Sequence, residues 1–244
     1  AGYYTGIQSI SSLGGADADN YELGVVTGDW TVTPRLISAS IEAGSSIYGD
    51  ALTPGAATLS GLIDGDQVDP ANVILDTSGR LSSSGNLRAG THTGIQQLGK
   101  LSGLDAANYT TVPMFGDFTP VTADYTVTAK VLDATIAAGS SVYGEALAPG
   151  AATLNGVVDG DNVLAGNVTI DTTGFTSTSG FLIAGLHEGI QRLADIAGAD
   201  AGNYSFAGAT GDYTVEKREV GGSIETASSV YGAGRLSTGV ATLM

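Results

Sequence analysis

The stretch SSIYGD at Ser45–Asp50 recurs as SSVYGE at Ser140–Glu145 and as SSVYGA at Ser228–Ala233. The tyrosines of the three copies lie at positions 48, 143 and 231, so successive copies are 95 and 88 residues apart (143 − 48 and 231 − 143). Self-similarity at such intervals is typical of tandem repeats, in which each unit packs mainly against its neighbours. We therefore interpret the chain as an array of repeats.

Two further motifs recur in the same order. GIQ occurs at Gly6–Gln8, Gly94–Gln96 and Gly189–Gln191. Each copy precedes an Asn-Tyr pair; the pairs are Asn20 and Tyr21, Asn108 and Tyr109, and Asn203 and Tyr204. The spacing from that tyrosine to the next Tyr-Gly motif is 34 residues in the middle copy and 27 in the other two. The difference places an insertion of seven residues (34 − 27) in 111–124. The two prolines of this segment predict a longer surface loop.

The apolar pattern predicts where one repeat ends and the next begins. Trp30 and Val32 alternate with polar residues, whereas Ile37 and Ile41 follow in the opposite parity after Pro34. Since side chains alternate between the faces of a strand, this change indicates that the chain leaves one core and enters another. The predicted segments are a partial repeat 1–34, a full repeat 35–129 containing the insertion 111–124, a full repeat 130–217 and a partial repeat 218–244. We expect a piece of a longer array cut inside repeats, with 35–217 better ordered than the outer segments.

Composition limits the partners and the chemistry. Against 9 Lys and Arg, the 25 Asp and Glu give a formal net charge of −16, which repels phosphate backbones and anionic lipid. We expect neither nucleic-acid binding nor membrane insertion. The 37 glycines among 244 residues are typical of a turn-rich chain with few helices. The absence of cysteine excludes disulfides, thiol catalysis and cysteine-ligated metals.

Within one repeat the local signals are those of β-strands. Asp124–Thr128 and Asn167–Asp171 are short, rich in β-branched or aromatic residues, and bounded by Gly, Asp and Ser. The Asp-Gly-Asp triplets at Asp64–Asp66 and Asp159–Asp161 suit tight hairpin turns. The stretch from Gly189 has helix-like spacing, but its counterpart in the first repeat is rich in Ser and Gly. We therefore expect an all-β fold, or a β-rich fold with a short helical turn.

In order along the repeat, the motifs read SSxYGxxLxxGxATLxGxxxGD, AGxHxGIQ, GxDAxNY and DYTVT. This succession resembles the MBG-type repeats (YGX class) of large bacterial surface proteins, among them the filamentous-haemagglutinin-like adhesins. The resemblance covers essentially the whole chain. It implies tandem β-grasp-like or sandwich-like units in an elongated array, extracellular and at the bacterial cell surface. It also implies a stalk or adhesive segment, with a role in cell adhesion or biofilm, and no active site.

Calcium is the metal for which the sequence offers ligands. A calcium ion takes six to eight hard oxygen ligands, and the candidates are Asp64, Asp66, Asp69, Asp159 and Asp161. Leu164 stands where the second copy would need the counterpart of Asp69, and the sequence has neither an EF-hand loop nor a nonapeptide calcium repeat. A plain turn is the favoured interpretation and calcium is the alternative. No other cofactor is expected.

The repeated aromatic motifs are predicted to be structural. A Tyr-Gly pair suits a buried ring beside a backbone turn; these residues are Tyr48, Gly49, Tyr143, Gly144 and Tyr231. In the Asn-Tyr motif we expect the preceding aspartate to accept backbone N–H bonds and the tyrosine to bury its ring. His92 and His187 are predicted to be surface or interface residues. With no G-x-S-x-G elbow, phosphate loop or dinucleotide fingerprint, we expect no enzyme.

The inserted loop provides an alternative function. It carries Met114, Phe115 and Phe118 in one repeat only, and departures from a repeat often bear a binding function. Our principal hypothesis is an extracellular structural segment of a bacterial adhesin or surface fibre. Its partners would be neighbouring repeats or other copies of the chain. The alternative is a carbohydrate- or matrix-binding module that engages a glycan or host surface through this loop.

Overall fold

The computed structural model describes residues 1–70, 72–112, 119–232, 234–235 and 238–244. Within these residues the regular elements are short strands and single turns of 3-10 helix, η1 (Ala18–Asn20), η2 (Ala106–Asn108) and η3 (Ala201–Asn203). The prediction of an all-β fold with a short helical turn is confirmed. The helical turn lies at the Asn-Tyr motif, whereas the GIQ motif lies within a strand. Across the described ranges, no helix is long and apolar enough to span a membrane.

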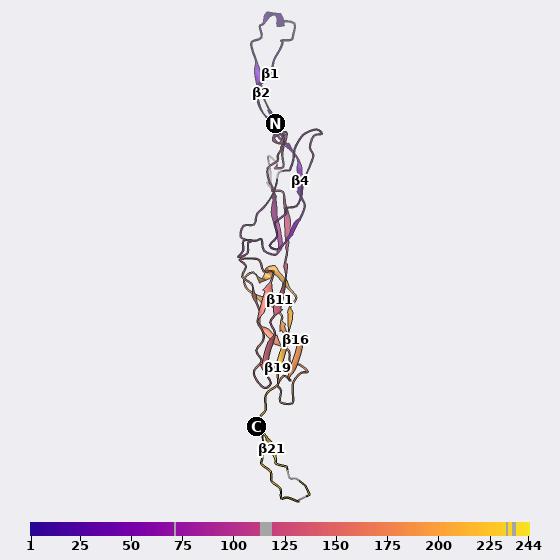
Figure 1. Ribbon diagram of the computed structural model, residues 1–244. Helices are drawn as coiled ribbons and strands as arrows, with labels where there is room; N and C mark the ends of the chain where they lie inside the picture. The colour runs from indigo at the N-terminus through magenta and orange to yellow at the C-terminus, as the bar shows by residue number, and fades with distance from the viewer. Residues whose placement is uncertain (71, 113–118, 233, 236–237) are drawn as a thin grey trace. The chain divides into compact units, whose positions relative to one another are not determined.

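The chain forms two compact units, and unit 1 comprises residues 1–130 together with Gly202–Tyr204. Its strands are β1 (Gly2–Ser9), β2 (Thr27–Val32), β3 (Arg35–Leu36), β4 (Ser38–Ile41), β5 (Gly44–Ile47), β6 (Ala57–Ser60), β7 (Val73–Leu75), β8 (Gly90–Leu98), β9 (Tyr109–Thr110) and β10 (Thr122–Thr128). β1 and β2 form an antiparallel ribbon (Figure 1). The main sheet has the strand order β5-β10-β8-β7. β4 pairs with β6 and β3 with β9 beside it.

Unit 2 comprises residues 131–201 and 205–244. The remaining strands are β11 (Lys130–Ile136), β12 (Gly139–Val142), β13 (Ala152–Asn155), β14 (Leu164–Ala165), β15 (Val168–Ile170), β16 (Gly185–Leu193), β17 (Ile196–Ala197), β18 (Tyr204–Phe206), β19 (Ala209–Glu216), β20 (Gly222–Ile224) and β21 (Ala241–Leu243). The main sheet has the order β12-β19-β16-β15. Its strands are the equivalents of β5, β10, β8 and β7, so the repeat in sequence is also a repeat in topology.

Each main sheet contains one parallel pair among antiparallel neighbours. β5 and β10 run parallel, with Gly44 opposite Tyr125 and Ile47 opposite Thr128. β12 and β19 are paired in the same way in unit 2. A parallel pair needs a long connection, and here the other two strands of the main sheet lie in sequence between its two members.

A buried tyrosine explains the glycine that opens β5 and β12. Tyr125 and Tyr213 are fully buried, and each hydroxyl accepts a hydrogen bond from a backbone N–H at 3.0 Å. A Cβ atom on Gly44 would lie 2.6 Å from the Tyr125 ring, and one on Gly139 would lie 2.7 Å from the Tyr213 ring. Such contacts are too short for any side chain, so only glycine lets the edge strand approach the ring.

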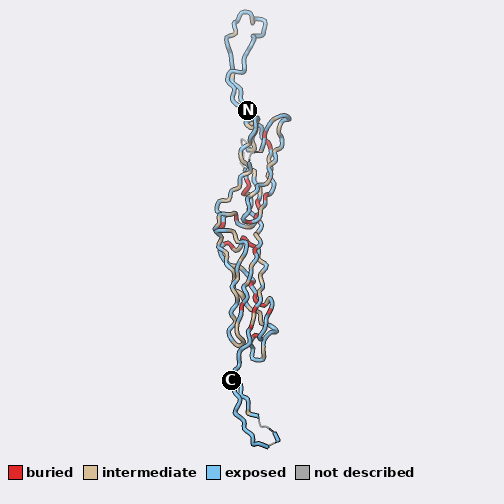
Figure 2. The backbone as a smooth tube through the Cα atoms, in the orientation of Figure 1, coloured by how far each residue is buried: buried red, intermediate tan, exposed pale blue. Residues whose placement is uncertain are grey.

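The apolar core is divided between the units. One cluster in unit 1 consists of Ile37, Val68 and Tyr109, and one in unit 2 of Leu182, Ile190, Tyr213 and Val215. By contrast, every residue of β1, β20 and β21 is exposed (Figure 2). Trp30 of β2 is 53% exposed, whereas its sequence equivalents Tyr125 and Tyr213 are fully buried.

The Asp-Gly-Asp triplets form tight turns but not hairpins. The N–H of Asp66 donates to the carbonyl of Ile63 (3.1 Å), and Gly65 has a φ of +93°. The triplet at Asp159–Asp161 forms the same turn. The predicted hairpin is wrong because the flanking strands do not pair with each other: β6 pairs with β4, and β7 pairs with β8.

Candidate functional site

The glutamine of the GIQ motif ties together backbone segments that are distant in sequence. Gln191 is fully buried; its Oε1 accepts from the N–H of Gly150 (2.6 Å). Its Nε2 donates to the carbonyls of Ala137 (3.0 Å) and Asp212 (2.6 Å). Gln96 makes the equivalent three bonds in unit 1. A buried amide with satisfied partners fixes the register of the surrounding backbone, because any shift leaves polar groups unpaired.

The glycine of the same motif creates a β-bulge. Gly94 has a φ of +65°, in the left-handed region that favours glycine, and its N–H donates to Oδ1 of Asp124 (2.8 Å). The same bond forms at Gly6 (2.9 Å) and Gly189 (2.8 Å). The GIQ motif is therefore a structural joint between two antiparallel strands.

The Tyr-Gly motif forms the predicted turn with a buried ring in unit 1. Gly49 has a φ of +86°, and Tyr48 is completely buried. The Tyr48 hydroxyl donates to Ser82 Oγ (2.7 Å) and lies 3.3 Å from Ser84 Oγ. These serines lie 34 and 36 residues after the tyrosine. Their Oγ atoms lie 3.0 Å apart, which completes a small polar cluster of three hydroxyls.

Unit 2 repeats this cluster in a more open form. Tyr143 bonds Ser177 (2.9 Å) and Ser179 (3.1 Å), and these bonds lower the pKa of the Tyr143 phenol, the one with Ser177 contributing most. Tyr143 is only half-buried and its ring lies 6.0 Å from that of Phe181. Since its partners are uncharged hydroxyls rather than an acid or a base, the cluster holds a turn and offers no proton-transfer chemistry.

The Asn-Tyr motif is hydrogen-bonded to the Asp-Gly-Asp turn of the same repeat. The Tyr109 ring is buried, its hydroxyl accepts from the N–H of Ile63 (3.0 Å), and it donates to the Asp66 carboxylate. The bond to Asp66 is the main reason that the pKa of Tyr109 is raised. Asp105 accepts from the N–H of Gln67 (2.9 Å), as predicted for the aspartate of this motif. In unit 2 the equivalent Asp200 accepts from the N–H of Asn162 (2.9 Å).

The calcium candidates lie in turns and do not converge on one point. Asp64 and Asp66 belong to the turn bonded to Tyr109, whereas the backbone of Asp69 bridges to Ser102. Asp159 and Asp161 lie in the equivalent turn of unit 2. In the part of the chain that the structure describes, no three or more His, Cys, Asp or Glu side chains are grouped as a metal ion would need.

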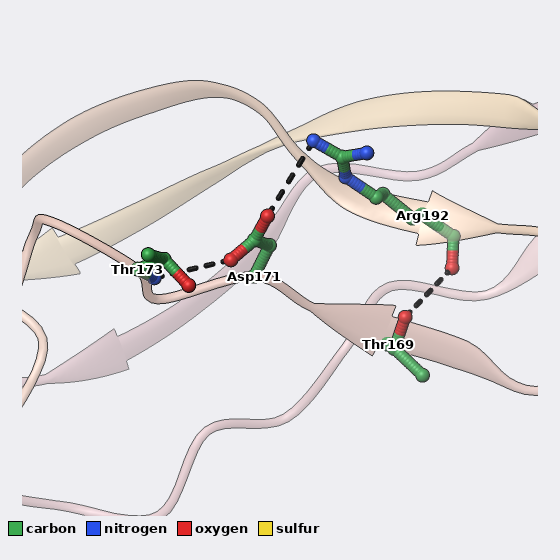
Figure 3. Close-up of polar contacts among 4 residues, drawn as sticks. All are labelled: Thr169, Asp171, Thr173 and Arg192. Atoms are coloured by element: carbon green, nitrogen blue, oxygen red, sulfur yellow. Dashed lines mark hydrogen bonds and ion pairs between the residues drawn. The ribbon is translucent and has the colours of Figure 1, made fainter.

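A charged pair joins Asp171, the residue after β15, to Arg192 in β16 (Figure 3). Asp171 accepts from the N–H of Thr173 (3.1 Å) and lies 3.5 Å from the Arg192 guanidinium, while Thr169 donates to the Arg192 carbonyl (3.4 Å). The hydrogen bonds from Thr173, and secondarily the charge of Arg192, hold the pKa of Asp171 below its ordinary value. Both charged side chains are substantially exposed, so the ion pair adds little stability. Asp171 is the cap of a turn.

The other predicted residues have mixed outcomes. His187 is buried against Phe175, with its Nε2 2.8 Å from the Ile183 carbonyl, so the surface assignment is wrong for this histidine. His92 makes the equivalent bond at a more open position. Three further motif residues, Asn20, Tyr21 and Tyr231, are exposed. The adhesion candidates Met114, Phe115 and Phe118 lie outside the described residues.

Two features were missed from the sequence. The sequence spacing identifies the glutamine of GIQ only as part of a repeated motif and does not predict its burial, although its recurrence beside an isoleucine in all three copies is the available signal. The serine pair was not singled out, although Ser-x-Ser follows Tyr-Gly at the same spacing in both full repeats. Both are polar groups whose partners lie far away in sequence.

No family model, no curated protein and no solved structure matches this chain.

Proposed function

We propose that the chain is an extracellular structural segment of a bacterial adhesin or surface fibre, serving as a stalk or spacer. The observation that carries this proposal is a parallel pairing within each main sheet. The strand that comes first along the chain pairs with the strand that comes last, β5 with β10 and β12 with β19. The same arrangement in both units supports a role that a repeated unit performs.

A parallel pair between the first and the last strand of a sheet, in the order of the chain, resists extension well. When the chain is pulled from its two ends, the first strand is drawn backward and the last strand forward. The ladder bonds between Gly139–Val142 and Tyr213–Glu216 then carry the load together instead of breaking one at a time. Resistance to force is governed by the rate of unfolding, which falls when several bonds must break in one step.

The buried glutamine reinforces this clamp. Gln191 bonds Ala137, which lies just before β12, and also Asp212 within β19. Separation of the two strands must therefore break these bonds as well as the ladder. The clamp consists of hydrogen bonds and packing in a chain without cysteine, so its strength does not depend on redox conditions. A net charge of −16 also opposes nonspecific association with other acidic surfaces.

Pulling the full chain between its two ends tests the proposal. Each unit should resist and then open in one step, releasing the chain between the clamp strands, on the order of 250–300 Å at full extension. A smooth extension without discrete events would contradict a mechanical role for the chain. Specific binding of the chain to a glycan array, lost in Phe115→Ala and Phe118→Ala, would instead favour the carbohydrate-binding alternative.

A further inference from the structure

The second serine of each full Tyr-Gly motif carries a buried hydroxyl with an unused hydrogen-bonding capacity. Within the described residues, the Oγ atoms of Ser46 and Ser141 are buried and neither has a hydrogen-bond partner. The two serines are equivalent, since each lies two residues before the tyrosine of its motif, and Ser229 has the same place in the third copy. A buried hydroxyl without a partner costs stability. Its recurrence in every copy therefore points to a role other than stability.

Each of these two serines lines a small pocket in its own unit. Ser46 stands opposite Val127 in the parallel pair of β5 and β10, and Ser141 stands opposite Val215 in the pair of β12 and β19. Both valines are buried and line the same pockets. The pocket beside Ser46 has a volume of about 140 Å³, and the pocket beside Ser141 has a volume of about 280 Å³.

The two pockets are built from equivalent residues. In unit 1 the Tyr48 ring packs against the Tyr204 ring, and the pocket is present there all the same, so it does not require an uncovered Tyr-Gly motif. The pocket is therefore a feature of the repeat. The equivalent pairs in its wall are Leu52 and Leu147, Leu87 and Leu182, and Asp50 and Glu145.

The pocket walls combine carbon surface with two kinds of polar group. The serine hydroxyl both donates and accepts hydrogen bonds, whereas the carboxylate of Asp50 or Glu145 only accepts them. Both acidic residues are exposed, which places them at the outer part of the pocket. Because no hydrogen bond holds the serine hydroxyl, rotation about its Cα–Cβ bond can turn it toward a ligand. A matching ligand needs hydroxyls at two points with carbon between them.

Charge and size narrow the class of ligand further. An ammonium group would bring a charge that apolar walls disfavour, whereas an alcohol brings none. An apolar cavity of roughly 150 Å³ accepts a molecule of the size of benzene. The pocket beside Ser46, at about 140 Å³, therefore has room for a polyol with a short carbon chain, and the pocket beside Ser141 has room for a longer one.

We propose that the pockets beside Ser46 and Ser141 are equivalent binding sites for a small aliphatic polyol. One ligand hydroxyl bonds to the serine Oγ, and another donates to the carboxylate of Asp50 or Glu145. The carbon chain packs against the leucines of the wall. Each full repeat contributes one site, so the number of sites increases with the number of repeats.

Titration of the full chain with glycerol, followed by NMR, tests this proposal. The methyl signals of Leu87 and Val127 report on one pocket, and those of Leu182 and Val215 report on the other. Both sets should shift and saturate, with dissociation constants on the order of 1–100 mM for so small a ligand. Propan-1-ol has the same carbon chain with a single hydroxyl and should bind about tenfold more weakly. Shifts that do not saturate, or equal affinity for the two alcohols, would overturn the proposal.

Substitutions in unit 2 use the pocket of unit 1 as an internal control. Ser141→Ala should weaken glycerol binding about tenfold in its own pocket and leave binding beside Ser46 unchanged. Glu145→Gln should also weaken binding, because a hydrogen bond to a charged acceptor is stronger than one to an amide. The matched control is Ser140→Ala, an exposed neighbour whose side chain lies on the other face of β12, and it should bind as the parent does.

The melting temperature of the ligand-free chain provides a second readout. Since Ser141→Ala removes a buried hydroxyl without a partner, this variant should melt about 5 °C higher than the parent. A melting temperature that does not rise would show that the hydroxyl is already satisfied in the free chain, and would overturn the argument. Glycerol binding that Ser141→Ala leaves unchanged would overturn it as well. Neither readout involves force, so this proposal and the proposed stalk function can fail separately.

Discussion

Replacement of Gln191 by methionine isolates the contribution of the buried tie. Methionine has a similar volume, so Gln191→Met removes hydrogen bonds without opening a large cavity. The change removes three hydrogen bonds of 2.6 to 3.0 Å. The N–H of Gly150 and the carbonyls of Ala137 and Asp212 then lose their side-chain partner. The substitution therefore tests the hydrogen bonds of buried polar groups rather than the packing of the core.

The expected loss follows from these three bonds. Each contributes about 0.5–1.5 kcal/mol net, and buried groups left unpaired add to the cost, so the free energy of unfolding should fall by about 3 kcal/mol. For a unit of this size, 1 kcal/mol shifts the melting temperature by about 4–8 °C. We therefore expect unit 2 to melt at least about 10 °C lower.

Thermal unfolding followed by circular dichroism, with urea titration for the free energy, measures this change. The matched control is Gln8→Met at the same place in the first GIQ motif, where the glutamine is exposed. That variant should stay within about 0.5 kcal/mol of the parent, as is usual for surface positions. Equal effects of the two substitutions would refute the role assigned to the buried tie.

Further predictions concern packing, acid and calcium. Gly139→Ala, whose Cβ would lie 2.7 Å from the Tyr213 ring, should cost about 1–3 kcal/mol by urea titration; Gly221→Ala, with open space around it, is the control, and equal costs would contradict the packing argument. Because the pKa of Asp171 is lowered in the fold, its stabilising effect is complete above about pH 3.8 and is lost as pH falls through the lower folded value. Asp171→Asn should flatten the decline of stability below that pH, and an unchanged acid profile would contradict the assignment. Chelation followed by millimolar calcium should leave the melting temperature unchanged, since the candidate carboxylates are dispersed in turns; a rise would show that folded chains bind the ion.

Local features of the fold were predictable from the sequence, whereas long-range partners were not. Alternation and turn residues predicted strands and tight turns, because those signals act over a few residues. The hairpin expected at Asp64–Asp66 failed because the pairing of β6 and β7 is decided by other strands. The parallel partner of β10 is separated from it by most of a repeat, and no short pattern encodes such a pairing.

The candidate site shows the same division. The buried tyrosine of the Asn-Tyr motif and the aspartate that accepts backbone bonds were predicted and are present at Tyr109 and Asp105. The burial of Gln96 was not predicted, because a polar residue enters a core only when its partners are present, and these come from three separate segments. The exposure of Tyr21 was not predicted either, because burial of that ring depends on neighbouring segments.

The clamp formed by β12 and β19 is tested most directly by pulling in two directions. Cysteine handles at Ala138 and Lys217 load the N-terminal end of one strand and the C-terminal end of the other, so the ladder is sheared. Handles at Glu145 and Lys217 load the C-terminal ends of both paired segments, where Val142 lies opposite Glu216, so the same ladder is peeled one bond at a time. We predict a clearly higher rupture force for the first pair than for the second at the same loading rate. Equal forces in the two directions would contradict the claim that the parallel pair bears the load.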